Sequence, residues 1–187
     1  MKRKLAAAIL GIATSAGLVT SAYAQGRIFF ASYNYSTNAK VTYDAGGGTG
    51  LNNTFTAGLW YFLGTATLSS GNGADVLPSG WELSPVTAQF ATVAPAGYFN
   101  GPIANIGDYV SGPITFAVTA YNGSSYDSSI LRGHSAGFTL ASIATGQNPA
   151  GEFGPGLQSF FIIIPEPSMF SLSSLGAAAL VVYRRKK

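Results

Sequence analysis

The chain has 187 residues, no cysteine and a formal net charge of +3, and only 9% of its residues are charged. The length suits one domain, and the missing cysteine excludes disulfides, thiol catalysis and cysteine-ligated metals. Residues 25–164 hold three basic and six acidic side chains, a formal charge of −3, so the positive charge belongs to the two ends. This distribution excludes a basic surface for nucleic acid, and no nucleic-acid partner is expected.

The first 24 residues have the three parts of a secretory signal peptide. A basic start at residues 2–4 precedes an apolar run at residues 5–19. Ala22 and Ala24 supply the small residues of a cleavage site, which places the cut before Gln25. We expect the Sec machinery and signal peptidase to act on this segment. The alternative is a retained N-terminal anchor, for which the apolar run is short.

After the cleavage site, short strand-like runs alternate with turns rich in Gly, Asn and Pro. The clearest runs are residues 56–63 and 113–121, where apolar and aromatic side chains recur with a period of two. Both faces of the first run carry large apolar groups, which predicts a central strand. Further strands are predicted at residues 27–33, 40–44, 85–93, 138–143 and 157–164, and residues 98–99 begin or end another.

The segments between these runs are predicted to be turns. Residues 45–53, 69–75 and 122–123 are turns by composition, and residues 126–132 are ambiguous, with one helical turn as an option. The glycines of the first loop are not followed by Gly-Lys-Ser/Thr or by a helical pattern, so a hairpin connection is favoured over a phosphate loop. Regularly spaced short strands predict an all-β ectodomain at residues 25–164, an antiparallel β-sandwich or jelly roll.

The C-terminal segment, residues 165–187, begins with a rigid triplet and continues as an apolar run. Pro165, Glu166 and Pro167 exclude a helix or a central strand, which predicts an extended and accessible peptide. The uncharged run at residues 169–183 can satisfy its backbone in lipid only as a helix. Its 15 residues would reach about 22 Å across a hydrocarbon core of about 30 Å, so snorkelling or bilayer thinning must close the gap.

Four basic residues end the chain: Arg184, Arg185, Lys186 and Lys187. They are expected to stay in the cytoplasm and leave the remainder of the protein outside, with the preceding helix in contact with membrane lipid. The alternative is a soluble helix packed on the ectodomain. Such a helix would show a polar face at helical spacing, and residues 175–183 show none.

The triplet, the short helix and the basic end, in this order, resemble the PEP-CTERM sorting signal of exported bacterial proteins. The resemblance covers only the tail, about an eighth of the chain. It implies that an exosortase, a membrane-embedded cysteine protease, recognises the triplet and removes the helix. Until this cleavage the helix would tether the protein transiently to the inner membrane, and after it the protein would reach the cell surface or the extracellular space. Three serines at positions 171, 173 and 174 make this helix more polar than is usual, which suits a removable tether.

The search for catalytic groups begins with the single histidine, His134, which lies in a turn rich in Gly and Ser. Ser135 or Ser159 with Asp108 or Asp127 would formally complete a Ser-His-Asp triad, but no Gly-x-Ser-x-Gly elbow supports one. An exposed loop histidine is therefore favoured. One histidine without cysteine also makes a zinc site improbable. We predict no catalytic residue and no enzymatic activity.

The acidic residues leave two further chemistries open. Between residues 25 and 164 they are Asp44, Asp75, Glu82, Asp108, Asp127 and Glu152. Their spacing singles out no pair for glycoside hydrolysis, and a secreted glycan hydrolase is kept as an alternative. The four aspartates lie near Gly or Asn, as in calcium loops and equally as in ordinary turns, so calcium stays open and no other cofactor is expected.

Aromatic side chains are the remaining candidates for a binding surface, because they stack on sugar rings. The candidates are Trp60, Trp81, Tyr98, Tyr109, Tyr121 and Tyr126, although most aromatics in a domain of this size belong to the core. The sequence thus predicts an exported surface or matrix protein with a structural or adhesive ectodomain. A carbohydrate-binding module for extracellular polysaccharide is the alternative.

Overall fold

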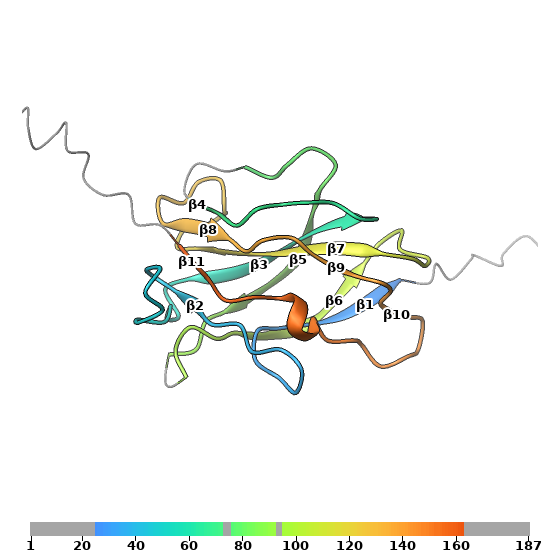
Figure 1. The fold of residues 1–187 in the computed structure, drawn as a ribbon, viewed down its shortest axis with the longest axis horizontal. Helices are drawn as coiled ribbons and strands as arrows, with labels where there is room; N and C mark the ends of the chain where they lie inside the picture. Colours follow the sequence, from blue (N-terminus) through green and yellow to red (C-terminus); the bar gives the residue numbers. More distant parts are fainter. Residues whose placement is uncertain (1–24, 73–75, 93–94, 163–187) are drawn as a thin grey trace, which may run out of the picture.

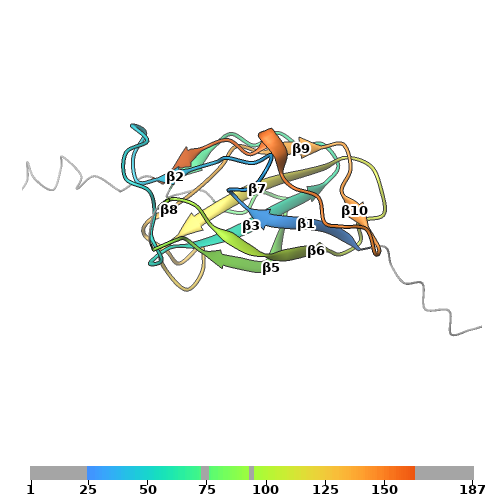
Figure 2. The same ribbon diagram turned by 90° about the horizontal axis from the view of Figure 1, so that it is seen from below.

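The computed structural model describes residues 25–72, 76–92 and 95–162. Within these ranges the chain is all-β, as predicted, and its sheets are antiparallel apart from one short parallel pair. Figures 1 and 2 show strands layered around a shared interior, a sandwich-like arrangement. The signal segment and the sorting tail lie outside the described residues.

The first sheet has three strands in the order β10-β1-β6. Strand β1 (Gly26–Ala31) lies between β6 (Asn100–Ile106) and β10 (Ala144–Thr145), antiparallel to both. The predicted strand at residues 27–33 is confirmed with slightly shifted ends. Residues 98–99 directly precede β6, in agreement with the option that they mark the beginning of a strand.

The larger sheet is built on β3 (Thr56–Leu63) and β7 (Ile114–Tyr121), which pair along their full length. Strand β5 (Glu82–Gln89) pairs with β3 on its other side, so the prediction that β3 is central is confirmed. All eight residues of β7 are buried, which explains its strongly apolar sequence.

Three short strands complete this sheet. Strands β8 (Arg132–His134) and β9 (Phe138–Leu140) follow one another along the free edge of β7, and β4 (Gly71–Asn72) pairs with β8. The turn predicted at residues 69–75 therefore contains a strand, and residues 126–131 form turns and bends that lead into β8. Tertiary pairing decides both segments, because β8 pairs with β7 and β4 pairs with β8.

Strand β5 begins three residues before the predicted start of residues 85–93 and ends four residues before the predicted end. Pro85 lies inside it, at the place where the pairing of β5 with β3 shifts register between Gly58 and Trp60. A proline cannot donate to the ladder, so a bulge is the position where a strand accepts it.

The last strand closes the fold beside an early one. Strand β11 (Phe160–Phe161) pairs in parallel with β2 (Val41–Thr42), and a 3-10 turn at Gly154–Gly156 precedes it. The backbone N–H of Ile162 then donates to the carbonyl of Thr42 at 3.0 Å. The strands predicted at residues 40–44, 138–143 and 157–164 are thus present in shorter form.

One large hydrophobic core lies between the layers. Ile28 and Phe30 from β1 pack in the same cluster as Leu59 from β3 and Phe116 and Val118 from β7. A second, smaller cluster lies around Trp60: Trp60, Trp81, Ala117, Tyr121 and Tyr126. The alternation of side chains along β3 separates the two clusters.

The glycine-rich segment at residues 45–53 is held in place through its backbone atoms. An antiparallel bridge between Thr42 and Gly50 makes it a hairpin connection, as predicted. The Lys40 ammonium donates to the carbonyls of Gly47 and Gly48 at 3.2 and 2.9 Å and holds the tip of the loop.

Candidate functional site

Two of the three exposed aromatic side chains of the described residues, Tyr33 and Tyr35, lie just beyond the end of β1, and the third is Phe161 in β11. The backbone N–H of Ser32 donates to the carbonyl of Phe99 at 3.1 Å, and the N–H of Ala91 donates to the carbonyl of Tyr98 at 2.8 Å. These bonds place Tyr33 beside Tyr98. Their rings meet edge to face with centroids 5.2 Å apart, and 58% of Tyr33 is exposed.

A tight hairpin carries a second exposed ring. The N–H of Asn34 donates to the carbonyl of Thr37 at 2.9 Å, and the N–H of Thr37 donates back to Oδ1 of Asn34 at 2.9 Å. Tyr35 lies at the tip of this turn and is fully exposed. In Figure 1 the segment between β1 and β2 loops away from the sheets.

The hairpin is fixed from two directions. The Glu152 carboxylate accepts hydrogen bonds from the N–H and the hydroxyl of Ser36. The Tyr98 hydroxyl donates to Oδ1 of Asn38 at 2.9 Å. Both contacts reach from the hairpin to distant parts of the chain, so the loop that presents Tyr35 is held in one position.

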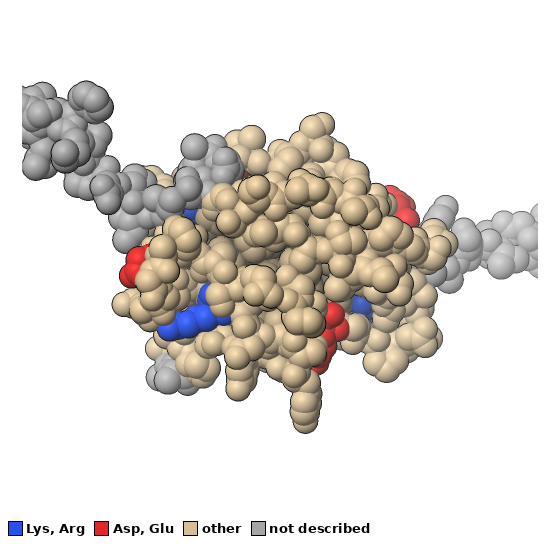
Figure 3. Space-filling model, in the orientation of Figure 1, with Lys and Arg blue, Asp and Glu red and all other residues tan. Residues whose placement is uncertain are grey.

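We call Tyr33, Tyr35 and Tyr98 the tyrosine surface. A shallow cleft of about 320 Å³ lies beside it, lined by Tyr33 and Tyr98 together with Gln89 and Asn100. The described lining consists of these amides and rings together with Ala91, Pro95 and Phe99, and it includes no charged side chain. On the face shown in Figure 3, acidic and basic groups are few and scattered. This surface therefore offers aromatic faces and neutral hydrogen-bonding groups.

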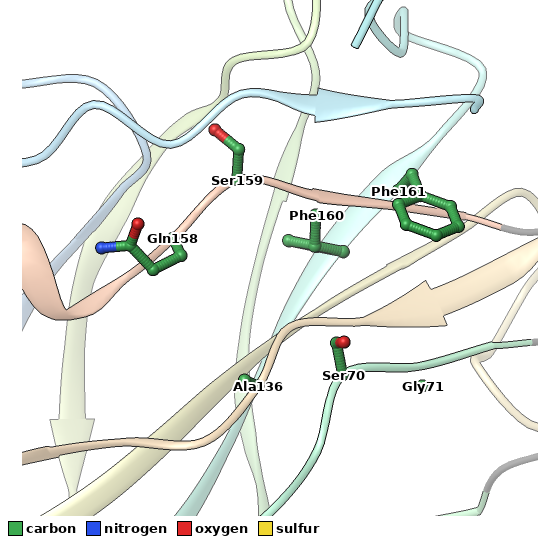
Figure 4. Close-up of a pocket in the computed structure, with 7 residues that line it drawn as sticks. All are labelled: Ser70, Gly71, Ala136, Gln158, Ser159, Phe160 and Phe161. Carbon is green, nitrogen blue, oxygen red and sulfur yellow. The ribbon is translucent and has the colours of Figure 1, made fainter. Parts of the chain in front are cut away.

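A different cleft follows the last strand. It holds about 220 Å³ between residues 158–161 and the segments that carry Ser70 and Ala136 (Figure 4). Among the described residues, its lining includes Gln158 and Ser159 but no carboxylate, imidazole or amine. The Ser159 hydroxyl has a structural role, because it accepts a hydrogen bond from the N–H of Lys40 at 3.0 Å. The described lining of this cleft therefore supplies no group for acid–base chemistry.

Most of the aromatic candidates from the sequence belong to the interior. Five of the six predicted candidates are buried: Trp60, Trp81, Tyr109, Tyr121 and Tyr126. Only Tyr98 is partly exposed, and it contacts Tyr33, a ring that the sequence analysis did not select. Tyr35, which the sequence analysis also did not select, lies two positions further along the same hairpin. The sequence does contain a signal for the exposure of Tyr33 and Tyr35. Residues 34–38 have the composition of a turn, and aromatic side chains within or beside a turn face solvent.

The prediction of an exposed loop histidine is wrong. His134 lies in β8, is 2% exposed, and packs its ring 5.1 Å from Trp60 and 6.4 Å from Tyr126. Alternation along β8 turns the neighbouring Gly133 toward Ile162, on the opposite side from the His134 ring. The Ser159 side chain, which lies with β11, is therefore on the wrong face of the sheet to reach His134.

Arg132 is also buried in this small cluster, with its guanidinium carbon 5.1 Å from the centroid of the Tyr126 ring. Its Nη1 donates to the carbonyl of Tyr126 at 2.7 Å. Ser135, the other serine considered for a triad, accepts from the N–H of Val118 at 2.9 Å and donates to the carbonyl of Ala136. These polar groups stabilise the break between β8 and β9 through hydrogen bonds inside the fold.

Glu82 is a described acid that contacts another titratable side chain. It accepts a hydrogen bond from the Tyr61 hydroxyl, its cross-strand neighbour. Burial, this hydrogen bond and the charges of Glu82 and Asp108 raise the pKa of Tyr61 to about 12. Such a phenol stays protonated at neutral pH, where it stabilises the sheet and does not act as a base.

The four aspartates considered for calcium do not form a described site. Asp44, Asp108 and Asp127 are exposed, and Asp75 lies outside the described residues. Within residues 25–72, 76–92 and 95–162, no three of the His, Asp and Glu side chains come together as a metal-binding group.

All but one of the residues predicted for sorting and cleavage lie outside the described ranges. They are Pro165, Glu166 and Pro167, the basic end at Arg184, Arg185, Lys186 and Lys187, and Ala22, Ala24 and Gln25 at the cleavage site, of which only Gln25 is described. In the described part of the chain, no helix is long and apolar enough to cross a bilayer.

No protein-family model, curated protein or solved structure matches this chain.

Proposed function

We propose that the protein is exported and acts as a structural or adhesive component of the cell surface or extracellular matrix. The observation that carries this proposal is the three-part tail: a two-proline triplet, an uncharged apolar run and four basic residues, behind a predicted N-terminal export signal. In the proposal, an exosortase-type protease cuts near Pro165, Glu166 and Pro167 after the chain has crossed the inner membrane. Residues 1–24 and 165–187 are removed, and the ectodomain remains.

The described body is compatible with cleavage close to its surface. Ile162 is buried and bonded to Thr42, and the triplet begins three positions later. Three residues of chain reach at most about 11 Å, so the protease would work directly beside the end of the body that carries β2 and β11.

The ectodomain in this proposal is a β-sandwich. Antiparallel sheets that share one core support the sandwich class. A jelly-roll order of strands stays a prediction.

Mass spectrometry of the protein recovered from its host tests the proposal. The expected product begins at Gln25 and ends near the triplet, and deletion of the processing protease should leave Lys187 in place. A double substitution, Pro165→Ala with Pro167→Ala, should block processing, whereas Pro149→Ala, which changes an exposed proline of the body, should not. An intact Lys187 end in normal cells would refute the proposal.

A second candidate function, binding of extracellular polysaccharide, is favoured by the tyrosine surface. Exposed rings beside amide side chains are the groups that bind sugars, since the rings cover C–H faces and the amides bond hydroxyls. Retention of the full-length protein on its host's own polysaccharide would support this candidate. Free passage through such a column would refute it.

A further inference from the structure

We propose that the tyrosine surface is a binding site for a neutral polysaccharide chain. This inference rests on the second candidate function and names its site and ligand class. Tyr33 and Tyr35 are the most exposed aromatic side chains among the described residues, and they lie two positions apart on one hairpin. Two exposed rings on one hairpin, one of them packed against the partly exposed ring of Tyr98, form an apolar patch of the kind that marks a binding surface.

The surface is preorganised, so binding does not have to order it. Tyr98 supports Tyr33 edge to face and is itself bonded to Asn38, while Glu152 holds the backbone next to Tyr35 through Ser36. Folding has therefore already immobilised the loop, and binding does not lose further conformational entropy there. A tyrosine ring also loses little conformational entropy on contact, because it has only two side-chain torsions.

The lining decides between ligand classes. Gln89 and Asn100 are exposed amides beside the rings, and each can both donate to and accept from a sugar hydroxyl. No cationic side chain is present in the described lining of the cleft, and residues 25–164 carry a formal charge of −3, so an anionic polymer would meet no counter-charge and net repulsion. The same described lining includes no carboxylate to bind a cationic ligand. The chemistry fits uncharged pyranose units.

A protein partner fits this surface less well. The cleft is shallow and its lining mixes rings, Ala91 and Pro95 with the exposed amides of Gln89 and Asn100, whereas stable protein interfaces bury a larger and continuous apolar centre. Protein association is therefore treated as an outcome of the test.

The test is affinity electrophoresis of the full-length chain in detergent through native gels that contain a soluble polysaccharide. The probes are hydroxyethylcellulose and galactomannan as neutral chains and polygalacturonate as an anionic one. We expect retardation by at least one neutral chain and none by polygalacturonate. The double variant Tyr33→Ala with Tyr35→Ala should bind roughly tenfold or more weakly, because two ring contacts are lost. Tyr33→Phe with Tyr35→Phe should bind nearly as the parent does, since the ring faces remain.

Phe161→Ala is the matched control, because it removes another exposed ring at β11 and should leave retardation unchanged. Gln89→Ala is an independent variant that keeps the hairpin intact and should also weaken binding. Absence of retardation by both neutral chains overturns the proposal, as does equal retardation of the double alanine variant or a preference for polygalacturonate. Retardation that depends on protein concentration without polysaccharide would assign the surface to self-association. Tail processing, followed by mass spectrometry of the same variants, stays normal in every case and separates this test from that of the sorting function.

Discussion

The glycine-rich loop permits a sharp test of how the fold is held together, because two of its glycines differ in surroundings. A Cβ atom on Gly50 would lie 2.3 Å from the carbonyl oxygen of Ala96 and 2.6 Å from the nitrogen of Gly97. A Cβ atom on Gly48 would have no atom within 4 Å. We therefore predict that Gly50→Ala strongly destabilises the protein and that Gly48→Ala does not.

The expected magnitude follows from the backbone contacts around Gly97. To admit the methyl group, the two segments must separate by roughly 1 Å, since ordinary contacts begin near 3.4 Å. Gly97 accepts from the N–H of Val41 and donates to the carbonyl of Leu51, both at 2.8 Å. Weakening these buried bonds costs about 1–3 kcal/mol, and overpacking adds about 1–3 kcal/mol. We expect a loss of about 3–5 kcal/mol, or roughly 10–15 °C in melting temperature.

Urea unfolding followed by tryptophan fluorescence measures this loss, because Trp60 and Trp81 are both buried. Gly48→Ala should change the free energy of unfolding by about 0.5 kcal/mol or less in either direction. Equal stability of the two variants, or a loss below about 1 kcal/mol for Gly50→Ala, would refute the close approach of the two segments.

Three further predictions concern buried polar groups. Burial and its hydrogen bond raise the pKa of Tyr61 from 10 to about 12, so the folded state holds this proton more tightly than the unfolded chain does. The free energy of unfolding should therefore fall as pH rises from 10 to about 12. Tyr61→Phe should flatten this pH dependence in alkaline unfolding experiments. Ser135→Ala leaves the buried N–H of Val118 without its acceptor and should cost about 1–3 kcal/mol in urea unfolding, whereas unchanged stability would contradict the bond. Arg132→Lys loses the planar contact with Tyr126 and should lower the melting temperature by a few degrees, and an unchanged melting temperature would argue against it.

The strands that the sequence predicted best are those whose patterns reflect the pleat. Residues 56–63 and 114–121 alternate clearly and are rich in β-branched and aromatic side chains, so local pattern and tertiary position agree. Strand β8 could not be predicted this way. Its sequence, Arg-Gly-His, has no strand propensity, and only the neighbouring aromatic rings and the edge of β7 make it a strand.

The tyrosine surface could be predicted only in part, for a related reason. Composition showed that aromatics were plentiful but did not say which were buried, since Trp60 and Tyr33 look alike in sequence. The contact between Tyr33 and Tyr98 joins positions 65 apart and depends on the extended pairing of β1 with β6. Long-range pairing of this kind leaves no local trace.

The parallel pairing of β2 with β11 has a consequence for the order of folding events. Val41 and Phe160 are 119 positions apart, so β2 can pair with β11 only after almost the whole described body has been synthesised. Contacts between such remote positions form late and slow the search for the native state. In the proposed sorting scheme, this pairing would form only once residues 160–161 have crossed the membrane, directly before the triplet follows them. Completion of the fold and cleavage at the tail would then be close in time, because both wait for the last residues of the body.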